Sequence, residues 1–93
     1  MDKRFNPMTP AEQAIARQAL YDFLQTNAGL SVAETLRAIR QHLRITVADL
    51  AGLSGLSERY ISQLEQGQGN PTLAAVTRLL KPFGLVLGVS LKS

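Results

Sequence analysis

The chain has 93 residues, a formal net charge of +3 at pH 7 and no cysteine. Its length is enough for one small domain, and a hydrophobic fraction of 45% is enough for a packed core. The lack of cysteine excludes disulfides and thiolate metal sites. No apolar run approaches the roughly 20 residues that span a bilayer, and the first ten residues lack the apolar core of a signal peptide. We therefore expect a cytoplasmic protein with no membrane partner.

Residues 1–8 are predicted to form a flexible arm, and residues 9–29 an N-terminal helix. Thr9 is a favourable N-cap, Pro10 fits the first helical position, and Glu12 completes a capping box. The helix carries one broad apolar stripe, which consists of Ile15, Ala16, Ala19, Leu20, Phe23 and Leu24. This stripe packs either on the core of its own chain or on a second subunit or partner protein.

Residues 31–84 are predicted to form a second, larger helical unit. Its first helix begins at Ser31, with Glu34 as capping-box partner, and its core-facing stripe consists of Val32, Leu36, Ile39 and Leu43. Arg40 lies at the edge of this stripe, so its charge needs a partner. Glu65 is the natural candidate, and a bidentate pair would orient the two helices that carry these residues. His42 is the single histidine, and no metal site is predicted around it.

Residues 46–65 organise this unit, because they combine two short helical patterns with almost no linker. Thr46 and Asp49 form a T-x-x-D box, Gly55 interrupts the pattern, and Ser57 caps a second helix. Two helices of roughly two turns with so short a connection must cross steeply, which is the geometry of a helix-turn-helix. The alternative is an ordinary helical hairpin in a bundle.

The last part of the chain changes its hydrophobic period. A loop over residues 66–71 precedes a helix that Thr72 caps and that ends near Lys81, before Pro82 and Gly84. Alternating apolar residues then predict a strand within residues 85–93; they are Leu85, Leu87, Val89 and Leu91. A lone strand is not stable, so we expect it to pair with its own copy in a two-fold dimer. The alternative is a last helical turn followed by an ordered apolar tail.

The segments LRAIRQHLRIT, TVADLAGLSGLSERYISQLEQG and GNPTLAAVTRLLKPFG resemble the phage-repressor/Cro-type (Xre) helix-turn-helix family. The positions of Arg40 and Glu65 match a structural ion pair of that family. The terminal LGVSL is similar to HipB-like antitoxins, in which C-terminal strands pair across a dimer, so the resemblance suggests a HipB/HigA-like antitoxin. The resemblance implies a helix-turn-helix domain, and the N-terminal helix has no counterpart in the minimal family domain. With this extra helix and the C-terminal strand, we expect a mainly α fold of five helices.

Two positions depart from the family pattern. The family commonly has Gln where this chain has Val47, and Val47 cannot support the phosphate contact of that Gln. The family favours Gly before the motif, where this chain has Arg44. Arg44 either holds a strained backbone conformation or lies in a different turn.

The second helix of the motif is expected to enter the major groove of DNA with its N-terminal end first. Arg59 suits guanine, Gln63 suits adenine, and Glu58 either accepts from cytosine or holds Arg59. The full set of predicted base contacts is Ser57, Glu58, Arg59, Ser62, Gln63 and Gln66, and the predicted phosphate contacts are Arg37, Arg44, Gln68, Asn70 and Thr72. The arm of residues 1–8 either frays or reaches into the minor groove.

The predicted function is sequence-specific binding of double-stranded DNA. One module reads a half-site, so we expect a homodimer on a palindromic operator and a small transcriptional repressor. Within that class we favour an autoregulating antitoxin of a toxin–antitoxin system, with a cognate toxin as a further partner. The alternatives are a stand-alone phage-like regulator and a protein-interaction module that has lost DNA binding. No cofactor is expected, and an enzyme is disfavoured by one His, no Cys and no paired carboxylates.

Overall fold

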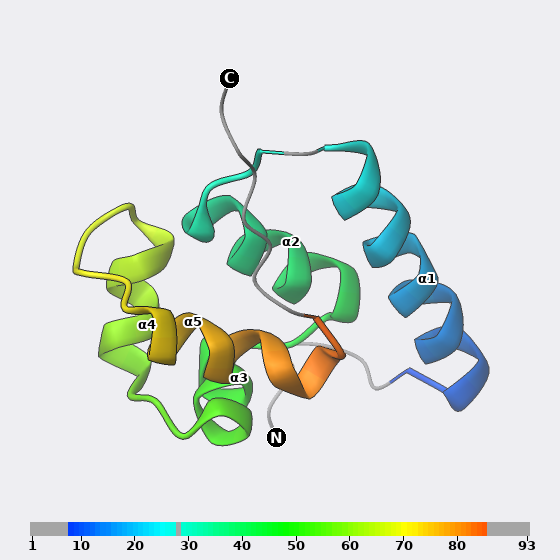
Figure 1. The fold of residues 1–93 in the computed structure, drawn as a ribbon. Coiled ribbons are helices and arrows are strands. Elements are labelled where there is room, and N and C mark those ends of the chain that lie inside the picture. Colours follow the sequence, from blue (N-terminus) through cyan, green and yellow to red (C-terminus); the bar gives the residue numbers. More distant parts are fainter. Residues whose placement is uncertain (1–7, 28, 86–93) are drawn as a thin grey trace.

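The computed structural model describes residues 8–27 and 29–85. The regular secondary structure of this part of the chain is entirely helical, as predicted for a mainly α protein of five helices, and the described residues contain no strand (Figure 1). The helices are α1 (Pro10–Thr26), α2 (Val32–Leu43), α3 (Val47–Ser54), α4 (Glu58–Glu65) and α5 (Leu73–Leu80), followed by a short 3₁₀ helix, η1 (Lys81–Phe83). None of the helices within the described ranges is long and apolar enough to cross a membrane.

The predicted N-caps are all present. Thr9, Ser31 and Thr46 each form a complete capping box at the start of α1, α2 and α3, in which the hydroxyl accepts from the third backbone N–H. Ser57 and Thr72 accept from the corresponding N–H groups of α4 and α5. Each cap satisfies backbone donors that would otherwise face the solvent unpaired, typically for about 1 kcal/mol. These local interactions explain why the helix starts could be read from the sequence.

Helix α2 lies in the middle of the molecule and packs against α1 on one side and α4 on the other (Figure 1). Helix α3 packs against both α4 and α5, which closes the unit. The core that joins these helices is fully buried; its largest members are Leu20, Leu36, Ile39, Leu50, Ile61 and Leu79. Every helix from α1 to α5 contributes to this set, so α1 shares one core with the four helices that follow it.

The apolar stripe of α1 is divided between the core and the solvent. Leu20 is fully buried, and Ala16, Phe23 and Leu24 pack against the core of the same chain. Ile15 is 70% exposed and Ala19 is also exposed. These four residues therefore pack on the core of their own chain, which is the first of the two alternatives predicted for the stripe. The apolar stripe predicted from the sequence is wider than the surface of α1 that packs on α2, because α2 lies against only one side of α1.

Two further contacts fasten α1 to the rest of the chain. The Tyr21 hydroxyl donates to the carbonyl of Phe83 at 2.8 Å, which joins α1 to η1. The ring of Phe23 lies 5.2 Å from the ring of His42 in α2. His42 is half-buried, with Nδ1 2.9 Å from the carbonyl oxygen of Ala38. The histidine therefore lies between two helices rather than at a free surface.

Leu85, the first of the predicted strand positions, takes part in the C-terminal cap of the last helix. Gly84 has a φ of +71° and donates its N–H to Lys81, while the N–H of Leu85 reaches back to the carbonyl of Leu80 at 3.2 Å. This pair of bonds is a Schellman motif, which needs a left-handed residue such as Gly. The side chain of Leu85 packs against the core. The other predicted strand positions, Leu87, Val89 and Leu91, and residues 1–7 of the predicted arm lie outside the described residues.

Candidate nucleic-acid interface

The connection between α3 and α4 is a tight turn that requires glycine. Gly55 has a φ of +77° and donates its N–H to the carbonyl of Ala51 at 2.9 Å. A Cβ atom at this position would lie 2.9 Å from Nη2 of Arg78, so the guanidinium of α5 covers the turn. The sequence did not assign this role to Arg78, because the two residues are 23 positions apart and only the packing of α5 on α3 brings them together. The turn joins α3 to α4 through residues 55–57 alone.

Helix α4 presents two chemically different faces. Ile61, Leu64 and Glu65 are buried against the rest of the domain. The residues predicted to contact bases lie on the other face; Ser57, Glu58, Arg59 and Gln66 are exposed, and Ser62 and Gln63 are half-buried. Exposed or half-buried side chains of all six therefore lie outside the buried face of α4, at its N-cap, along the helix and at its C-cap. A helix with an outward row of hydrogen-bonding side chains has the shape and chemistry to lie in a major groove.

Arg40 and Glu65 join α2 to the end of α4. The Arg40 guanidinium donates from Nε to Oε2 of Glu65 at 2.6 Å and from Nη2 to Oε1 at 2.8 Å, which is a bidentate pair. Glu65 is only 7% exposed. These charged hydrogen bonds raise the pKa of Arg40 above its ordinary value, although partial burial opposes the shift. The pair fixes the position of α4 relative to α2.

A second arginine of α2 holds the same end of α4. Nη1 of Arg37 donates to the backbone carbonyl of Glu65. A cation at a helix C-terminus also interacts favourably with the helix dipole. Arg37 was predicted to contact phosphate, which stays a prediction, and one of its guanidinium nitrogens binds the end of α4. The side chain of Arg37 is exposed, so this bond leaves it accessible to solvent.

The other predicted phosphate contacts lie on either side of α4. Gln68 and Asn70 are exposed on the loop between α4 and α5, and Thr72 caps α5. The loop is tied to α4, since Gln68 donates its N–H to the carbonyl of Gln63 at 2.8 Å and Tyr60 donates its hydroxyl to that of Asn70 at 2.9 Å.

Arg44, another predicted phosphate contact, is the C-cap of α2 and lies in the connection between α2 and α3. It is exposed and adopts the left-handed conformation, with φ 55° and ψ 46°. Of the two alternatives for this position, the strained conformation is therefore the one that the chain adopts. Val47, at the start of α3, packs against the core, so this apolar side chain contributes to packing.

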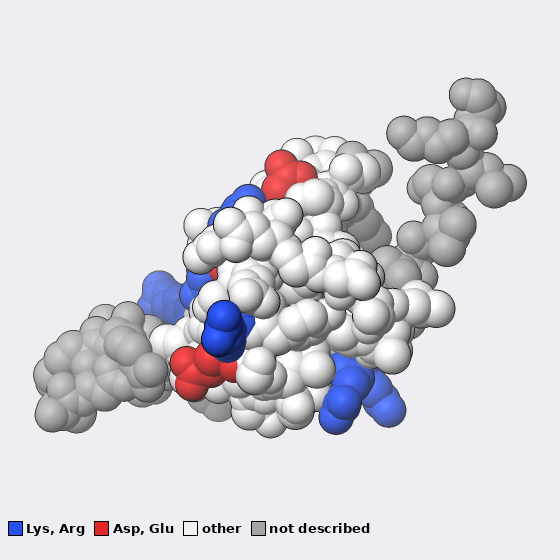
Figure 2. Space-filling model, turned by 90° about the vertical axis from the view of Figure 1, so that its left-hand side faces the viewer, with Lys and Arg blue, Asp and Glu red and all other residues white. Residues whose placement is uncertain are grey.

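Figure 2 shows the side of the molecule on which α4 lies. Basic groups are spread over this face, acidic groups lie beside some of them, and most of the surface is uncharged. Such a surface gives only moderate electrostatic attraction to phosphates, so contacts from individual side chains must supply much of the affinity. Within the described ranges, no group of three or more His, Asp or Glu side chains could hold a metal ion.

Comparisons with known proteins agree with this geometry. The chain matches the helix-turn-helix domain family over residues 27–89, a region that starts directly after α1. It is 34% identical over 65 residues to an uncharacterized HTH-type transcriptional regulator of Haemophilus influenzae, which covers 70% of this chain and 66% of that protein. It is 33% identical over 58 residues to the HTH-type transcriptional regulator DdrOP3 of Deinococcus deserti (62% and 45%). It is 36% identical over 62 residues to the HTH-type transcriptional regulator PuuR of Escherichia coli (67% and 34%).

No solved structure shows a significant match. The chain spans between about a third and two thirds of the length of these curated relatives. The family match covers more than half of the 93 residues and contains the whole of α2, α3, α4 and α5. This chain therefore belongs to the helix-turn-helix domain family.

Proposed function

We propose that this protein binds double-stranded DNA sequence-specifically, with α4 as the recognition helix in the major groove. The observation that carries the proposal is the polar outer face of α4, held in place by a buried inner face and by the Arg40–Glu65 pair. The relatives named HTH-type transcriptional regulators support a role in transcription regulation.

In this proposal the side chains of α4 divide the work of base recognition. Arg59 donates to O6 and N7 of a guanine, and Gln63 forms two bonds with an adenine. Glu58 accepts a hydrogen bond from a cytosine. Ser57, Ser62 and Gln66 make further polar contacts with bases. Phosphates on either side meet the outer face of α2, Arg44 and the loop that carries Gln68, Asn70 and the cap residue Thr72.

The same proposal includes a homodimer that represses transcription from a palindromic operator. A single recognition helix covers one half-site, and two copies would place two such helices about 34 Å apart on one face of the DNA. We further propose that the protein is an antitoxin that represses its own operon. Helix α1, which precedes the family match, is then an added surface for a cognate toxin.

The test is a fluorescence-anisotropy titration on labelled DNA from upstream of the gene and on random DNA, at low and moderate salt. We expect tight, salt-sensitive binding to the upstream DNA. Arg59→Ala should weaken that binding by about 1–3 kcal/mol and leave random DNA nearly unaffected. Arg17→Ala removes the same charge from an exposed site on α1 and is the matched control. Equal affinity of the wild type for both DNAs would refute autoregulation, and equal effects of the two substitutions would refute base readout by Arg59.

A further inference from the structure

The loop that follows α4 is fastened to that helix at two points. The N–H of Gln68 donates to the carbonyl of Gln63 at 2.8 Å. The hydroxyl of Tyr60 donates to the carbonyl of Asn70 at 2.9 Å. Gly69 lies between these two points in the chain. The loop is therefore held on both sides of Gly69, beside the second half of α4.

Gly69 lies against the side chain of Gln63. A Cβ at position 69 would lie 3.6 Å from Cβ and 3.9 Å from Oε1 of Gln63. Gln63 is half-buried, whereas Arg59, about one turn earlier on α4, is exposed. Within the described ranges, no hydrogen-bond partner takes up the Gln63 amide. The loop therefore borders this side chain and leaves its polar atoms available to a ligand.

A glutamine that reads adenine must hold its amide in one orientation. Its N–H donates to N7 while its carbonyl accepts from the N6 amino group, and both bonds form only when the amide lies along the edge of the base. A side chain that rotates freely loses conformational entropy when it is fixed in this way. This loss weakens binding by about threefold to tenfold for one side chain. A support that restricts the side chain beforehand avoids most of it.

We propose that the loop, fastened by Tyr60, positions the Gln63 amide to read an adenine. Tyr60 and Gln63 are three residues apart and are therefore neighbours on one face of α4. The bond from Tyr60 to Asn70 holds Gly69 beside the Gln63 side chain. Tyr60 is thus a positioning residue, which needs no contact with DNA. The inference rests on the proposed function and deepens it, because it adds a determinant of sequence preference that is not itself a base contact.

The test is selection of bound sequences from a randomised DNA pool, which requires no known operator. Gln63→Ala identifies the position that Gln63 reads, as the one at which the preference for adenine over the next most frequent base is lost. Tyr60→Phe keeps the ring and removes only the hydroxyl. We expect Tyr60→Phe to lower the adenine preference at that position by about threefold to tenfold and to leave the other positions unchanged. Adding Tyr60→Phe to Gln63→Ala should change the preference no further.

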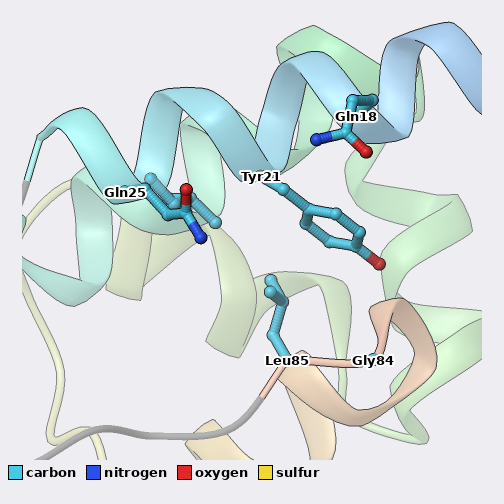
Figure 3. Close-up of a pocket in the computed structure, with 6 residues that line it drawn as sticks. Gln18, Tyr21, Gln25, Gly84 and Leu85 are labelled. Atoms are coloured by element: carbon cyan, nitrogen blue, oxygen red, sulfur yellow. The ribbon is translucent and has the colours of Figure 1, made fainter.

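Tyr21→Phe is the matched control for the loss of a tyrosine hydroxyl. Tyr21 also donates to a backbone carbonyl, that of Phe83, at 2.8 Å. Its side chain lines an open pocket and reaches from α1 toward Gly84 and Leu85 (Figure 3). Since α2 lies between α1 and α4 (Figure 1), this control should leave the adenine preference unchanged. An equal loss in both variants, each with helical circular dichroism retained, would overturn the proposal.

Two glycines of the loop provide a second matched pair. Gly67 and Gly69 have φ values of +77° and +79°, and asparagine tolerates this region better than most residues. Nothing lies within 4 Å of a Cβ at position 67, whereas a Cβ at position 69 meets Gln63. Gly69→Asn should therefore change the adenine preference, and Gly67→Asn should not. Equal effects on that preference would contradict the proposed support of Gln63 by the loop.

The same selection separates failure of this inference from failure of the proposed function. A Tyr60→Phe protein with the wild-type preference, at a position where Gln63→Ala loses it, would overturn the inference and leave base recognition by α4 intact. A wild-type protein that selects no sequence would refute the proposed function and this inference together. Unchanged preferences in Gln63→Ala would refute adenine reading by Gln63, and with it the role of Tyr60.

Discussion

The left-handed backbone of Arg44 leads to a prediction in which stability and DNA binding change in opposite directions. Arg44 has φ 55° and ψ 46° and is the one residue other than glycine with a positive φ within the described ranges. Its N–H and that of Ile45 both reach the carbonyl of Arg40, which closes α2. The substitution Arg44→Gly keeps these bonds and removes the Cβ that makes the conformation unfavourable.

The expected gain follows from two opposing terms. A residue with a Cβ pays about 1–2 kcal/mol in the left-handed region. Glycine loses more backbone entropy on folding, which offsets about 0.4–1 kcal/mol of that gain. The net increase in the free energy of unfolding is therefore about 1 kcal/mol, and a domain of this size should melt about 4–8 °C higher.

The assay is urea denaturation followed by circular dichroism, with Arg44→Ala as the matched control. Alanine removes the same charge but keeps the Cβ, so its stability should stay near that of the wild type. The difference between the two variants isolates the backbone term. If Arg44→Gly is no more stable than Arg44→Ala, the backbone at this position is not strained and the reasoning is wrong.

The same two variants test the proposed phosphate contact. Both should bind operator DNA more weakly, and both should lower the slope of log affinity against log salt by about 0.9. Their loss should be equal on operator and random DNA, because phosphate contacts carry no sequence information. An unchanged salt slope would remove Arg44 from the interface while leaving the stability argument intact.

Three further predictions concern stability. Glu65→Leu should cost about 3 kcal/mol in urea denaturation because it leaves the Arg40 charge without its partner, and adding Arg40→Met should recover most of the loss; a double variant as unstable as the single one would contradict this. The Ser31 N–H and hydroxyl hold the pKa of Glu34 below its ordinary value of 4.5. The stability that the ionised Glu34 contributes is fully present above pH 4.5 and is lost as the pH falls through its lower folded pKa. Glu34→Gln should therefore make the urea midpoint fall less steeply as the pH is lowered below 4.5. The same pH dependence in wild type and variant would refute the assignment. Gly55→Ala should cost about 1–2 kcal/mol through its positive φ. Adding Arg78→Ala should recover little of this, because the nearest atom to a Cβ belongs to a flexible side chain that can move away.

The sequence was most informative where structure depends on near neighbours. The caps at Thr9, Ser31 and Thr46 act over three residues, so each helix start could be predicted from a few letters. Leu85 illustrates the limit. The alternating pattern assigned it to a strand, but its bond to Leu80 depends on how the helix before it ends, and the other strand positions lie outside the described residues.

Apart from the Arg40–Glu65 pair, which was predicted and is present, contacts between distant residues were not available from the sequence. The stripe of α1 predicted apolar contact for Ile15 and Ala19, which are exposed, because the width of the contact is set by α2 and not by α1. The bond from Tyr21 to Phe83 and the guanidinium of Arg78 over Gly55 join residues that are far apart in the chain. Neither has a local signal, and both appear only once the helices are packed.

The separation between the two faces of α4 has a consequence for engineering. The buried side chains of this helix are Ile61, Leu64 and Glu65. The side chains predicted to contact bases are different residues, and of these Ser57 also caps the helix. A library that varies positions 58, 59, 62, 63 and 66 therefore leaves the core, the ion pair and the turn unchanged. If α4 is the recognition helix as proposed, such a library changes the residues that face DNA while the residues that hold the helix in place stay the same.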